Sequence, residues 1–489
     1  MTSPLSTDHL PATPTLARAS DEADLPPLLT GWRRLWTRPA LMPYVRLVVL
    51  VLAINVAVAV TVLPGTSSPA RLDLTLTAAA LNLGAAAVIR QQHVVNLLFR
   101  LATSAPVTWP LRVRAGLAKV YHLGGIHVGA AISATAWFTV FAATALSPDG
   151  RGELSGPTLG VVVVLALLLL TIAALATAPL RRRRHDLFEM SHRLGGWSTL
   201  AGFAALTVLF ARDLSPDDPS GAILSAPATW VLAVVVVCVG LPWLHLRKVA
   251  VDVHTPSSHV AIVRLHHDPK TFVGSSTTIA RHPLGQWHPF ANLVTPSRPE
   301  LRLAISRAGD WTGSFIDSPP DHVWVRGVPT AGAGNVGKLF RKVVWITTGS
   351  GIGPCLPSLL AGAPAHLVWV TRTPEATFGP GLVGEITQSL PDALVWDTRA
   401  LGKPDLVALA LDAVRTTGAE AVICISNRPT TFQVVEGLES RGIPAFGAIW
   451  DSCGALHHPP PDGVTSGAPA GCGRSQRVSA RRTSAVPRA

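Results

Sequence analysis

The sequence predicts a bundle of six membrane-spanning α-helices, followed by a small antiparallel β-barrel and an α/β domain built on a parallel sheet. Three observations support this fold class. Charged residues make up only 14% of the 489 residues and the mean hydropathy is +0.36, which is typical of membrane proteins. Long apolar stretches are confined to the first half of the chain. The second half changes to short strands and then to alternating strands and helices, which indicates separate β and α/β domains.

Six apolar stretches approach the roughly 20 residues that are needed to cross a bilayer. They occupy about residues 43–63, 72–89, 117–146, 159–180, 194–210 and 230–246. Lys and Arg gather at one set of ends, whereas the opposite loops mix Arg with Asp and Glu. The positive-inside rule then places both termini and the soluble half in the cytoplasm. We expect a multi-pass protein of the cell membrane, with membrane lipid as a partner. The net charge of +12 is explained by this topology, so we expect no nucleic-acid partner.

The segment 91–114 between the second and third spans mixes apolar residues with arginines. Two interpretations stay open for it. It is either an amphipathic helix at the membrane interface or a plain connecting loop.

Histidines near the cytoplasmic ends of the odd-numbered spans are candidate haem ligands. The third span carries His122 and His127, and the fifth begins beside His192. A haem iron takes two imidazoles from facing helices. Five residues separate the third-span histidines, so they point about 140° apart and only one can face His192. We predict one haem b held by His127 and His192, with His122 as the alternative ligand. The competing interpretation is hydrogen bonding to lipid headgroups or neighbouring helices.

A second haem would need another histidine pair about four turns further along the same two spans. Phe141 and Ala205 stand near those depths. A complete electron relay across the bilayer is therefore not expected.

The soluble half begins with short strands and turn signals from about residue 254 to residue 329. Residues 301–306 alternate at period two, as a half-buried strand does. From Arg341 the pattern becomes alternating strands and helices, which predicts a parallel sheet that binds its ligand at the carboxyl ends of the strands. The glycine-rich turn at residues 348–354 follows the first of these strands. Its glycines would let the backbone approach a pyrophosphate at the start of a helix.

The two ends of the chain are polar and rich in Pro, Gly or Ser, which favours disordered tails. We expect no cleaved signal peptide and no disulfides among the five cysteines. The predicted domains are a tail (1–40), the six-span domain (41–250), the barrel (251–330), the α/β domain (331–455) and a second tail (456–489).

Three motifs in the soluble half occur in a familiar order and at familiar spacing. They are Trp-His-Pro-Phe at 287–290, Gly-Asp-Trp-Thr at 309–312 and Thr-Gly-Ser-Gly-Ile-Gly-Pro at 348–354. They resemble the ferredoxin–NADP reductase-like module that is attached to ferric reductase and NADPH oxidase membrane domains. Together with Gly-Gly-Ile-His at 124–127 and His-Arg-Leu-Gly-Gly-Trp at 192–197, they are most similar to the TmpA-type integral membrane reductase-like proteins. The resemblance covers about residues 32–452.

This resemblance implies an NAD(P)H-dependent oxidoreductase that contains FAD. Electrons would pass from NADPH or NADH through FAD, with one inner haem as an optional station, to an unknown acceptor such as ferric iron, a quinone, oxygen or a partner protein. The flavin would lie against the barrel near Trp287, His288, Pro289, Phe290, Ala291, Thr295 and Arg307. The dinucleotide would be held by Thr348, Gly349, Ser350, Gly351, Ile352, Gly353, Pro354, Cys355 and Arg372.

Departures from the family pattern leave a second function open. Ala291 stands where the family has Ser or Thr, and Cys424-Ile425-Ser426-Asn427 replaces the usual Cys-Gly. A catalytically weak flavin- and nucleotide-binding sensor, or a partner subunit, would tolerate both changes. Cys355 begins a helix and is expected to be a packing residue more often than a redox one. Arg372 would contact a 2′-phosphate, although it is equally well a solvated loop residue, and so NADPH and NADH both stay open.

Overall fold

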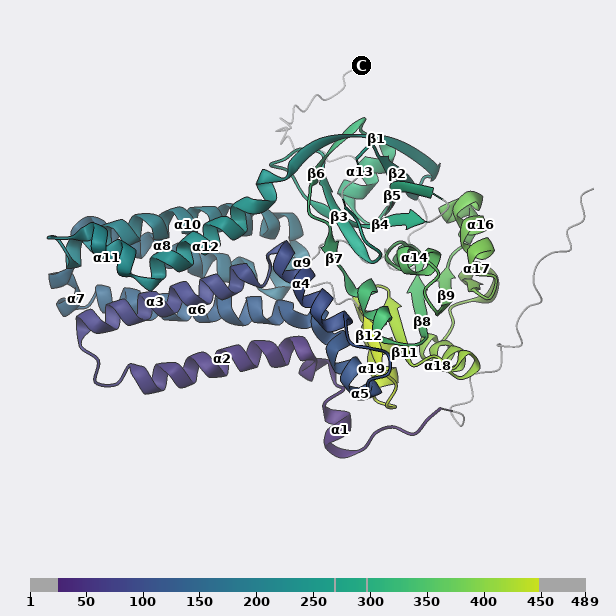
Figure 1. Cartoon of the computed structure of the whole chain (residues 1–489), viewed down its shortest axis with the longest axis horizontal. Coiled ribbons are helices and arrows are strands. Elements are labelled where there is room, and N and C mark those ends of the chain that lie inside the picture. Colours follow the sequence, from purple (N-terminus) through teal and green to yellow (C-terminus); the bar gives the residue numbers. More distant parts are fainter. Residues whose placement is uncertain (1–24, 268–269, 296–297, 448–489) are drawn as a thin grey trace, which may run out of the picture.

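The computed structural model describes residues 25–267, 270–295 and 298–447, and it has an elongated helical half and a compact two-domain half (Figure 1). Residues 25–40, which were assigned to a disordered tail, instead form α1 (Gly31–Leu35) and η3 (Pro39–Leu41). The backbone N–H of Leu29 donates to the carbonyl of Ser440 at 2.7 Å, and Leu25 packs on the α/β core. The tail prediction is wrong for this segment because these contacts fix it. Residues 1–24 and the C-terminal tail lie outside the described residues.

The helical half contains the six long helices that the hydropathy pattern predicts. They are α2 (Pro43–Val62), α3 (Ser68–Val88), α6 (Gly124–Ala145), α8 (Gly156–Leu175), α10 (His185–Leu214) and α12 (Pro227–Leu244). Five helices are long and apolar enough to cross a membrane by themselves, and α3 becomes the sixth only with α4 (Gln92–Thr103), from which it is bent by 68°. Shorter helices connect them: α5 (Leu111–Leu117), η4 (Ala118–Leu123), α7 (Pro148–Glu153), α9 (Ala178–Arg183) and α11 (Pro219–Ser225).

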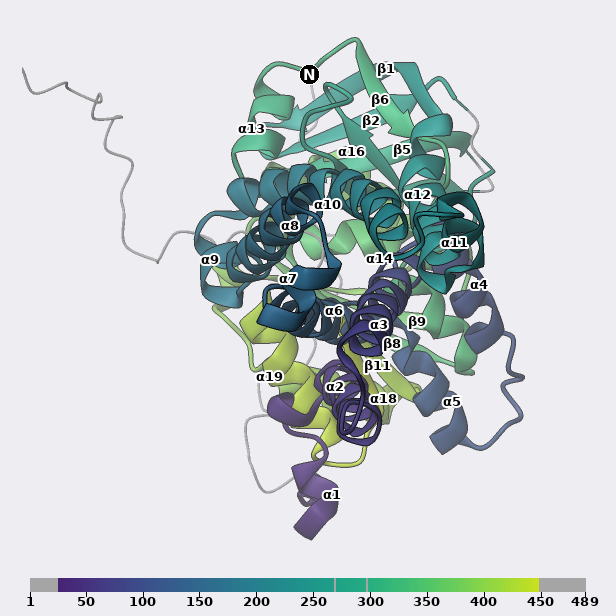
Figure 2. The same ribbon diagram turned by 90° about the vertical axis from the view of Figure 1, so that its left-hand side faces the viewer.

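Five of the long helices form a ring, seen along its axis in Figure 2. Helix α3 packs on α6, α6 on α8, α8 on α10, α10 on α12, and α12 on α3. Helix α2 lies outside the ring against α6. The ring encloses a core that includes Leu72, Trp137 and Leu165, while Val56 and Val164 on its outer surface are 61% and 64% exposed.

The segment 91–114 is helical for most of its length and packs on the soluble half. Helix α4 contacts β7 (Thr330–Ala331) and η5 (Ala333–Leu339). The amide nitrogen of Asn96 donates to the carbonyl of Pro329 at 2.9 Å, and its oxygen accepts from the backbone N–H of Ala331 at 2.8 Å. Phe99 is buried in the same core cluster as Trp345. The amphipathic-helix interpretation is therefore correct in its secondary structure, and the apolar face covers protein.

The first soluble domain is a closed antiparallel barrel. Its strands are β1 (Leu246–Ser257), β2 (Val260–Leu265), β3 (Ser275–Ala280), β4 (His288–Thr295), β5 (Arg298–Ser306) and β6 (His322–Arg326). They pair in the order β4-β5-β2-β1-β6-β3, and a further pairing between β3 and β4 closes the barrel. Helix α13 (Asp310–Asp317) packs Phe315 and Ile316 into the barrel core, and β7 adds to β3 outside it.

The second soluble domain has a five-stranded parallel sheet in the order β10-β9-β8-β11-β12. The strands are β8 (Val343–Thr348), β9 (Ala365–Thr371), β10 (Leu394–Asp397), β11 (Ala421–Ile425) and β12 (Ala445–Gly447). The connecting helices are η6 (Gly349–Gly351), α14 (Ile352–Leu360), α15 (Pro374–Phe378), α16 (Pro380–Ser389), α17 (Thr398–Leu401), α18 (Leu406–Thr417) and α19 (Arg428–Glu439). This pairing of a closed antiparallel barrel with a parallel α/β domain is the module that the sequence predicts.

Polar contacts join the helical and soluble halves at several points. Arg114, at 4% side-chain exposure, makes a two-pronged ion pair with Glu420 at 2.7 and 3.1 Å and donates to the carbonyl of Leu339. On the barrel side, Arg193 of α10 donates to the carbonyls of Leu284 and Gly285, both at 2.7 Å. These contacts fix the orientation of the barrel and the α/β domain relative to the bundle.

Candidate functional site

The two cofactor motifs of the sequence meet at one interface. Helix α14, which begins at the glycine-rich turn, packs against β4, which carries the Trp-His-Pro-Phe motif. Leu293 of β4 shares a core cluster with Ile352 and Cys355 of α14. A flavin against β4 and a dinucleotide at the turn would therefore be neighbours, as hydride transfer requires.

The alternation of side chains along β4 divides its motif between two faces. His288 stacks on Trp311 with ring centres 4.2 Å apart, and Phe290 stacks on the same ring at 6.1 Å. Pro289 and Ala291 occupy the other register, which they share with Leu293. The rings of His288 and Phe290 are thus engaged by α13, and Ala291 is the motif residue on the face that turns to α14.

Trp287 has a different place from the one predicted for it. Its ring lies 6.5 Å from that of Trp243 on α12, and the guanidinium of Arg326 sits 4.3 Å above it. Burial lowers the pKa of Arg326 to about 10, and nearby Arg193 adds to this effect. Trp287 therefore ties the barrel to the helical bundle, because the loop before β4 faces α12.

The structure gives less support to a flavin contact for two of the other predicted residues. Arg307 makes an ion pair with Asp317 and donates to the carbonyl of Ser258, so its guanidinium already holds α13 in place. Thr295 lies at the end of β4, and its side chain is outside the described residues. Contacts of both residues with a flavin stay predictions.

The glycines of the 348–354 turn have unequal roles. A Cβ at Gly351 would lie 2.3 Å from the carbonyl oxygen of Ile425, so this glycine is needed for packing of the turn on β11. Gly349 has a φ of +49° and open space where its Cβ would be. At Gly353 the nearest atom to such a Cβ is the Ala304 carbonyl oxygen at 3.9 Å. Gly349 and Gly353 are therefore the positions where a ligand could approach the backbone.

Contacts across the carboxyl edge of the sheet hold this turn. The hydroxyls of Thr348 and Ser426 are 2.5 Å apart, and the indole N–H of Trp369 donates to the carbonyl of Gly349 at 3.0 Å. The sequence analysis did not assign Trp369 to the site. Its position on the second strand of the parallel sheet, next to β8, is the feature of the sequence that could have indicated a role in the site.

Cys355 is a packing residue. It is fully buried and its thiol donates to the carbonyl of Gly351 at 3.2 Å. Burial raises the pKa of the Cys355 thiol, and that of Cys424 to about 12. The thiol thus packs beneath the turn, and a contact of Cys355 with the nucleotide stays a prediction. Arg372 is exposed just after β9, and its contact with a 2′-phosphate stays a prediction.

Of the three candidate haem ligands, two lie beside each other and the third lies apart from them. The rings of His127 and His192 face each other with centres 6.2 Å apart and an interplanar angle of 72°. His122 stacks on Tyr121 instead and lines a cavity beside α19. His122 lies on the 3-10 helix η4 and His127 on α6, and of the two it is His127 that lies beside His192.

The pair fits an axial-ligand set in two respects. Metal–imidazole bonds are about 2 Å long, so two imidazoles on one iron have ring centres about 6 Å apart. The Nδ1 of His127 lies 2.8 Å from the carbonyl oxygen of Ala86, which can only accept, so Nδ1 carries the proton and Nε2 keeps its lone pair. The Nδ1 of His192 is buried with no hydrogen-bond partner among the described residues.

The neighbouring glycines, at positions 124, 125, 195 and 196, do not all leave room for a macrocycle. A Cβ at Gly125 would meet the carbonyl oxygen of Tyr44 at 2.3 Å, and one at Gly195 would meet Ile172 at 2.8 Å. These two glycines serve close helix packing. Gly196 alone of the four has open space around it.

The outer half of the ring is filled with phenylalanines. Phe138 packs on Phe141 and Phe203 with ring centres 5.3 and 5.2 Å apart, and Phe141 packs on Phe210 at 5.8 Å. Phe141 is fully buried. The depth at which a second haem would lie is thus occupied by aromatic core.

Comparisons with known proteins found similarity to two fungal reductases. Residues 333–452 match the family model described as Adenylate-forming reductase 03009, C-terminal domain. The chain is 41% identical over 370 residues to Adenylate-forming reductase 03009 of Coprinopsis cinerea, and 39% identical over 369 residues to Adenylate-forming reductase 06235 of the same fungus. Each match covers 75% of this chain and 36% of the relative, so the chain spans about a third of the length of these curated relatives.

Among solved structures, a ferredoxin NADP+ reductase from Neisseria gonorrhoeae with bound FAD and NADP is similar at 12% identity and a TM-score of 0.34. That match covers 42% of this chain and 98% of the other. The chain is therefore similar in sequence to part of two fungal adenylate-forming reductases.

Proposed function

We propose that this protein is a membrane-anchored NAD(P)H-dependent flavin oxidoreductase that passes electrons from NAD(P)H through FAD to an acceptor on the cytoplasmic side. One observation carries the proposal. The glycine turn, with open space beside Gly349, lies at the start of α14, and α14 packs on the strand that carries the flavin motif.

The residues present fit both cofactors. The turn at 349–354 would hold the pyrophosphate of the dinucleotide through its backbone N–H groups. Ala291, which is half-buried, would offer an apolar contact to the flavin ring on the face of β4 that turns to α14. FAD, when bound, accepts a hydride and can release the two electrons one at a time. The packing of α14 on β4 excludes water from this interface and orients the two partners.

Membrane anchoring rests on the outer surface of the bundle. The most apolar 18-residue windows of α2 and α12 are 0% buried within the protein. So large an apolar surface would be unstable in water and is stable in a bilayer. The arginine-rich ends of the spans favour a cytoplasmic position for the soluble half by the positive-inside rule.

The proposal includes one haem b between His127 and His192. Their spacing and the tautomer imposed on His127 by Ala86 support it. Because phenylalanines fill the outer half of the ring, electrons would stop in the inner half and return to a cytoplasmic or lipid-soluble acceptor.

The nucleotide site is tested with Gly353→Val. A Cβ at Gly353 would make only an ordinary contact in the protein, at 3.9 Å from the Ala304 carbonyl oxygen, but a valine side chain would block a pyrophosphate, so NAD(P)H affinity is expected to fall by about tenfold or more with normal flavin content. Gly351→Val is a poor test, since its side chain would collide with the Ile425 carbonyl and destabilise the turn whatever the ligand. Unchanged NAD(P)H affinity in well-folded Gly353→Val would show that the turn is only structural.

The haem is tested by absorbance of the purified full chain expressed with ample haem. His127→Leu and His192→Leu are both expected to abolish the Soret band, whereas His122→Leu, which alters a histidine on the same span, is expected to keep it. A wild-type protein with no Soret band would refute the haem and leave the flavin proposal intact.

A second function, a flavin- and nucleotide-binding sensor or partner subunit, is favoured by Ala291. A methyl group there cannot donate the hydrogen bond that a Ser or Thr hydroxyl could give to the flavin ring. Anaerobic addition of NADPH or NADH separates the two functions. Bleaching of the flavin absorbance within seconds supports the reductase, and a bound but unreduced flavin supports the sensor.

A further inference from the structure

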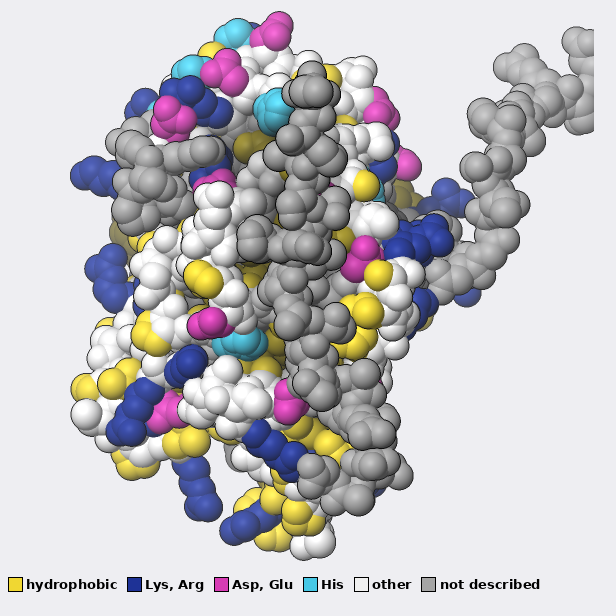
Figure 3. All heavy atoms as spheres, turned by 90° about the vertical axis from the view of Figure 1, so that its right-hand side faces the viewer, with side chains coloured by type: hydrophobic (Ala, Val, Ile, Leu, Met, Phe, Trp, Pro, Cys, Tyr) yellow, Lys and Arg dark blue, Asp and Glu magenta, His cyan; other side chains and the backbone are white. Residues whose placement is uncertain are grey.

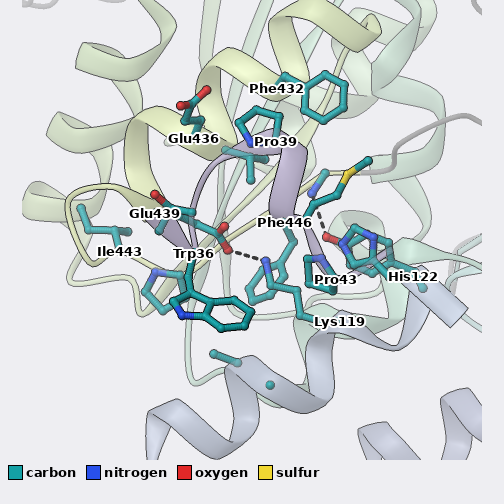
Figure 4. A pocket seen from close by; sticks show the side chains of 18 of the residues that line it. Trp36, Pro39, Pro43, Lys119, His122, Phe432, Glu436, Glu439, Ile443 and Phe446 are labelled. Atoms are coloured by element: carbon teal, nitrogen blue, oxygen red, sulfur yellow. Dashed lines mark hydrogen bonds and ion pairs between the residues drawn. The ribbon is translucent and has the colours of Figure 1, made fainter. Parts of the chain in front are cut away.

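A cavity of about 360 Å³ lies where the bundle, the pre-span segment and the α/β domain meet (Figure 4). Its walls come from the residues just before α2, from η4, from α19 and from β12. Trp36, Phe432 and Phe446 give it aromatic surfaces, and His122 and Lys119 are among its polar groups. Cavities of a few hundred Å³ with apolar walls and a few convergent polar groups are typical of small-molecule sites.

Of the polar side chains that line the cavity, His122 is the most buried. Its side chain is only 4% exposed, it lines the cavity, and the described residues give it no hydrogen-bond partner. A buried imidazole that makes no hydrogen bond carries a desolvation cost, which a ligand could relieve. His122 can donate to or accept from that ligand, depending on its tautomer.

The Lys and Arg side chains that line the cavity already interact with other groups of the protein. Lys119 pairs with Glu439 and donates to the carbonyl of Ala445. Arg46 donates to the carbonyls of Leu41 and Trp36, and its guanidinium lies 4.0 Å from the Trp36 ring. A phosphate group would find no cation that is free of such contacts. The available chemistry instead favours a neutral, flat ligand with a carbonyl oxygen.

The position of the cavity sets a second requirement for the ligand. Pro39, Met42 and Pro43 form part of its wall, so it lies where α2 begins. In the proposed orientation this is the cytoplasmic boundary of the bilayer. His122 is also five residues from His127, about 8 Å along the helix axis. The ligand should therefore be amphipathic, reachable from the membrane and redox active.

We propose that this cavity binds the head ring of a lipid-soluble quinone, which is the electron acceptor of the reductase. The inference rests on the proposed function. The overall reaction is NAD(P)H + H⁺ + quinone → NAD(P)⁺ + quinol. The two electrons come from NAD(P)H, and each quinone carbonyl becomes a hydroxyl by gaining one proton. His122 gives a proton to the carbonyl oxygen that it contacts and recovers one from water at the cavity mouth.

The cavity can be filled without disturbing the protein. Gly116 lines it, and a Cβ at this position would have no atom within 4 Å. Gly116→Phe is therefore expected to fold and to occupy the space of the ligand. The matched control is Gly152→Phe on α7, where a Cβ would also have no atom within 4 Å and which does not line the cavity.

The experiment uses the full chain in phosphatidylcholine nanodiscs with ubiquinone-1 as the probe. Equilibrium binding of ubiquinone-1 is measured without NAD(P)H, and its reduction is measured with NAD(P)H. Gly116→Phe is expected to raise the Kd at least tenfold, and Gly152→Phe to leave it unchanged. His122→Leu is expected to raise the Kd severalfold and to lower kcat, while His122→Gln, which keeps a hydrogen-bond donor, recovers the affinity and not kcat.

Unchanged binding of ubiquinone-1 to Gly116→Phe overturns the proposal, as does absence of binding to the wild type. Loss of a co-purifying phospholipid from Gly116→Phe with unchanged quinone affinity also overturns it and identifies a lipid site. Failure of the reductase proposal is a different result, in which NAD(P)H does not bleach the flavin although ubiquinone-1 still binds.

Discussion

The bundle and the soluble module use the same apolar residue types in opposite places. The apolar window of α2 is 0% buried in the protein, whereas Val344, Trp345 and Ile346 of β8 are at most 1% exposed. Charged side chains are scattered over the outer face of the soluble module (Figure 3). Apolar content alone therefore does not determine which residues form the core of a protein. What matters is the solvent that each element meets, which is lipid for the proposed spans and water for the module.

Buried polar groups extend the same comparison. In the bundle, Asn55 accepts at 2.8 Å from the amide of Asn82 and at 2.8 Å from the indole of Trp137, which links α2, α3 and α6. In the module, the amide of Asn335 donates to the carbonyl of Gly274 at 2.7 Å. Both interiors contain such hydrogen-bonded amides, but the cost of losing a hydrogen bond is expected to differ between them.

The largest effect is expected from truncating the core of the module. Leu303 is fully buried in the barrel, so Leu303→Ala should destabilise the module by about 2–5 kcal/mol. Leu167 on α8 is 61% exposed, and Leu167→Ala should cost less than about 1 kcal/mol, because its side chain leaves few protein contacts behind. Thermal unfolding of both variants in detergent checks this. Equal losses would contradict the assignment of the outer bundle surface to lipid.

The joint between the halves should be nearly as sensitive. Arg114→Ala would leave Glu420 part-buried without its main cation, at a cost of about 3 kcal/mol. The matched exposed pair, Arg264 with Glu300 at 46% and 45% exposure, should lose at most about 1 kcal/mol in Arg264→Ala. Limited proteolysis and the melting temperature measure the loss of stability in both variants. A similar small loss for the two variants would mean that the halves are not held together at this joint.

A charged residue on the outer surface of the bundle tests directly whether α2 spans the membrane. Val56 lies in α2 and is 61% exposed. Val56→Arg should cost about 2.5–3.5 kcal/mol at the centre of a membrane span, and the variant should be depleted from the membrane fraction of cells relative to Val56→Leu. On a water-facing surface the same change would be nearly neutral. Full recovery of Val56→Arg without detergent would refute the spanning role of α2.

The smallest effect is expected for hydrogen bonds inside the bundle. Asn82→Leu should cost about 0.6 kcal/mol, a typical value for interhelical hydrogen bonds in membranes. Asn335→Leu removes two bonds that the amide donates, to the carbonyls of Gly274 and Gly332, and the acceptor of the Lys338 ammonium, so about 1–3 kcal/mol is expected. Chemical denaturation of the two variants in the same detergent compares them. A larger loss for Asn82→Leu would reverse this part of the comparison.

Much of the fold was predictable because its signals are local. Hydropathy located the long helices of the bundle, since a span needs a continuous apolar run. The period-two alternation at residues 301–306 predicted β5, and the run from Val343 followed by a glycine turn predicted β8 and α14. The residues before α2 were assigned wrongly, because Leu29 and Leu25 are fixed by partners more than 400 residues away or on distant strands.

The candidate site was predictable in outline and not in detail. The motif order predicted that β4 and α14 would serve one site, yet the sequence could not assign Trp287 to the bundle or separate Gly351 from Gly353. Those roles depend on which backbone lies opposite each residue, as the Ile425 carbonyl does at Gly351. The same holds for Cys355, whose thiol is buried by the helix that it begins.

The sequence by itself determined which segments are apolar, which turn can approach a phosphate, and that His122 and His127 point in different directions. Each of these follows from composition or from the fixed periods of a helix and a strand. Only the tertiary structure decided that His127 faces His192, that phenylalanines fill the outer ring, and that His122 opens into a cavity formed with α19 and β12. The reason is physical: a periodicity fixes the direction of a side chain relative to its own element, and packing between distant elements fixes what that side chain meets.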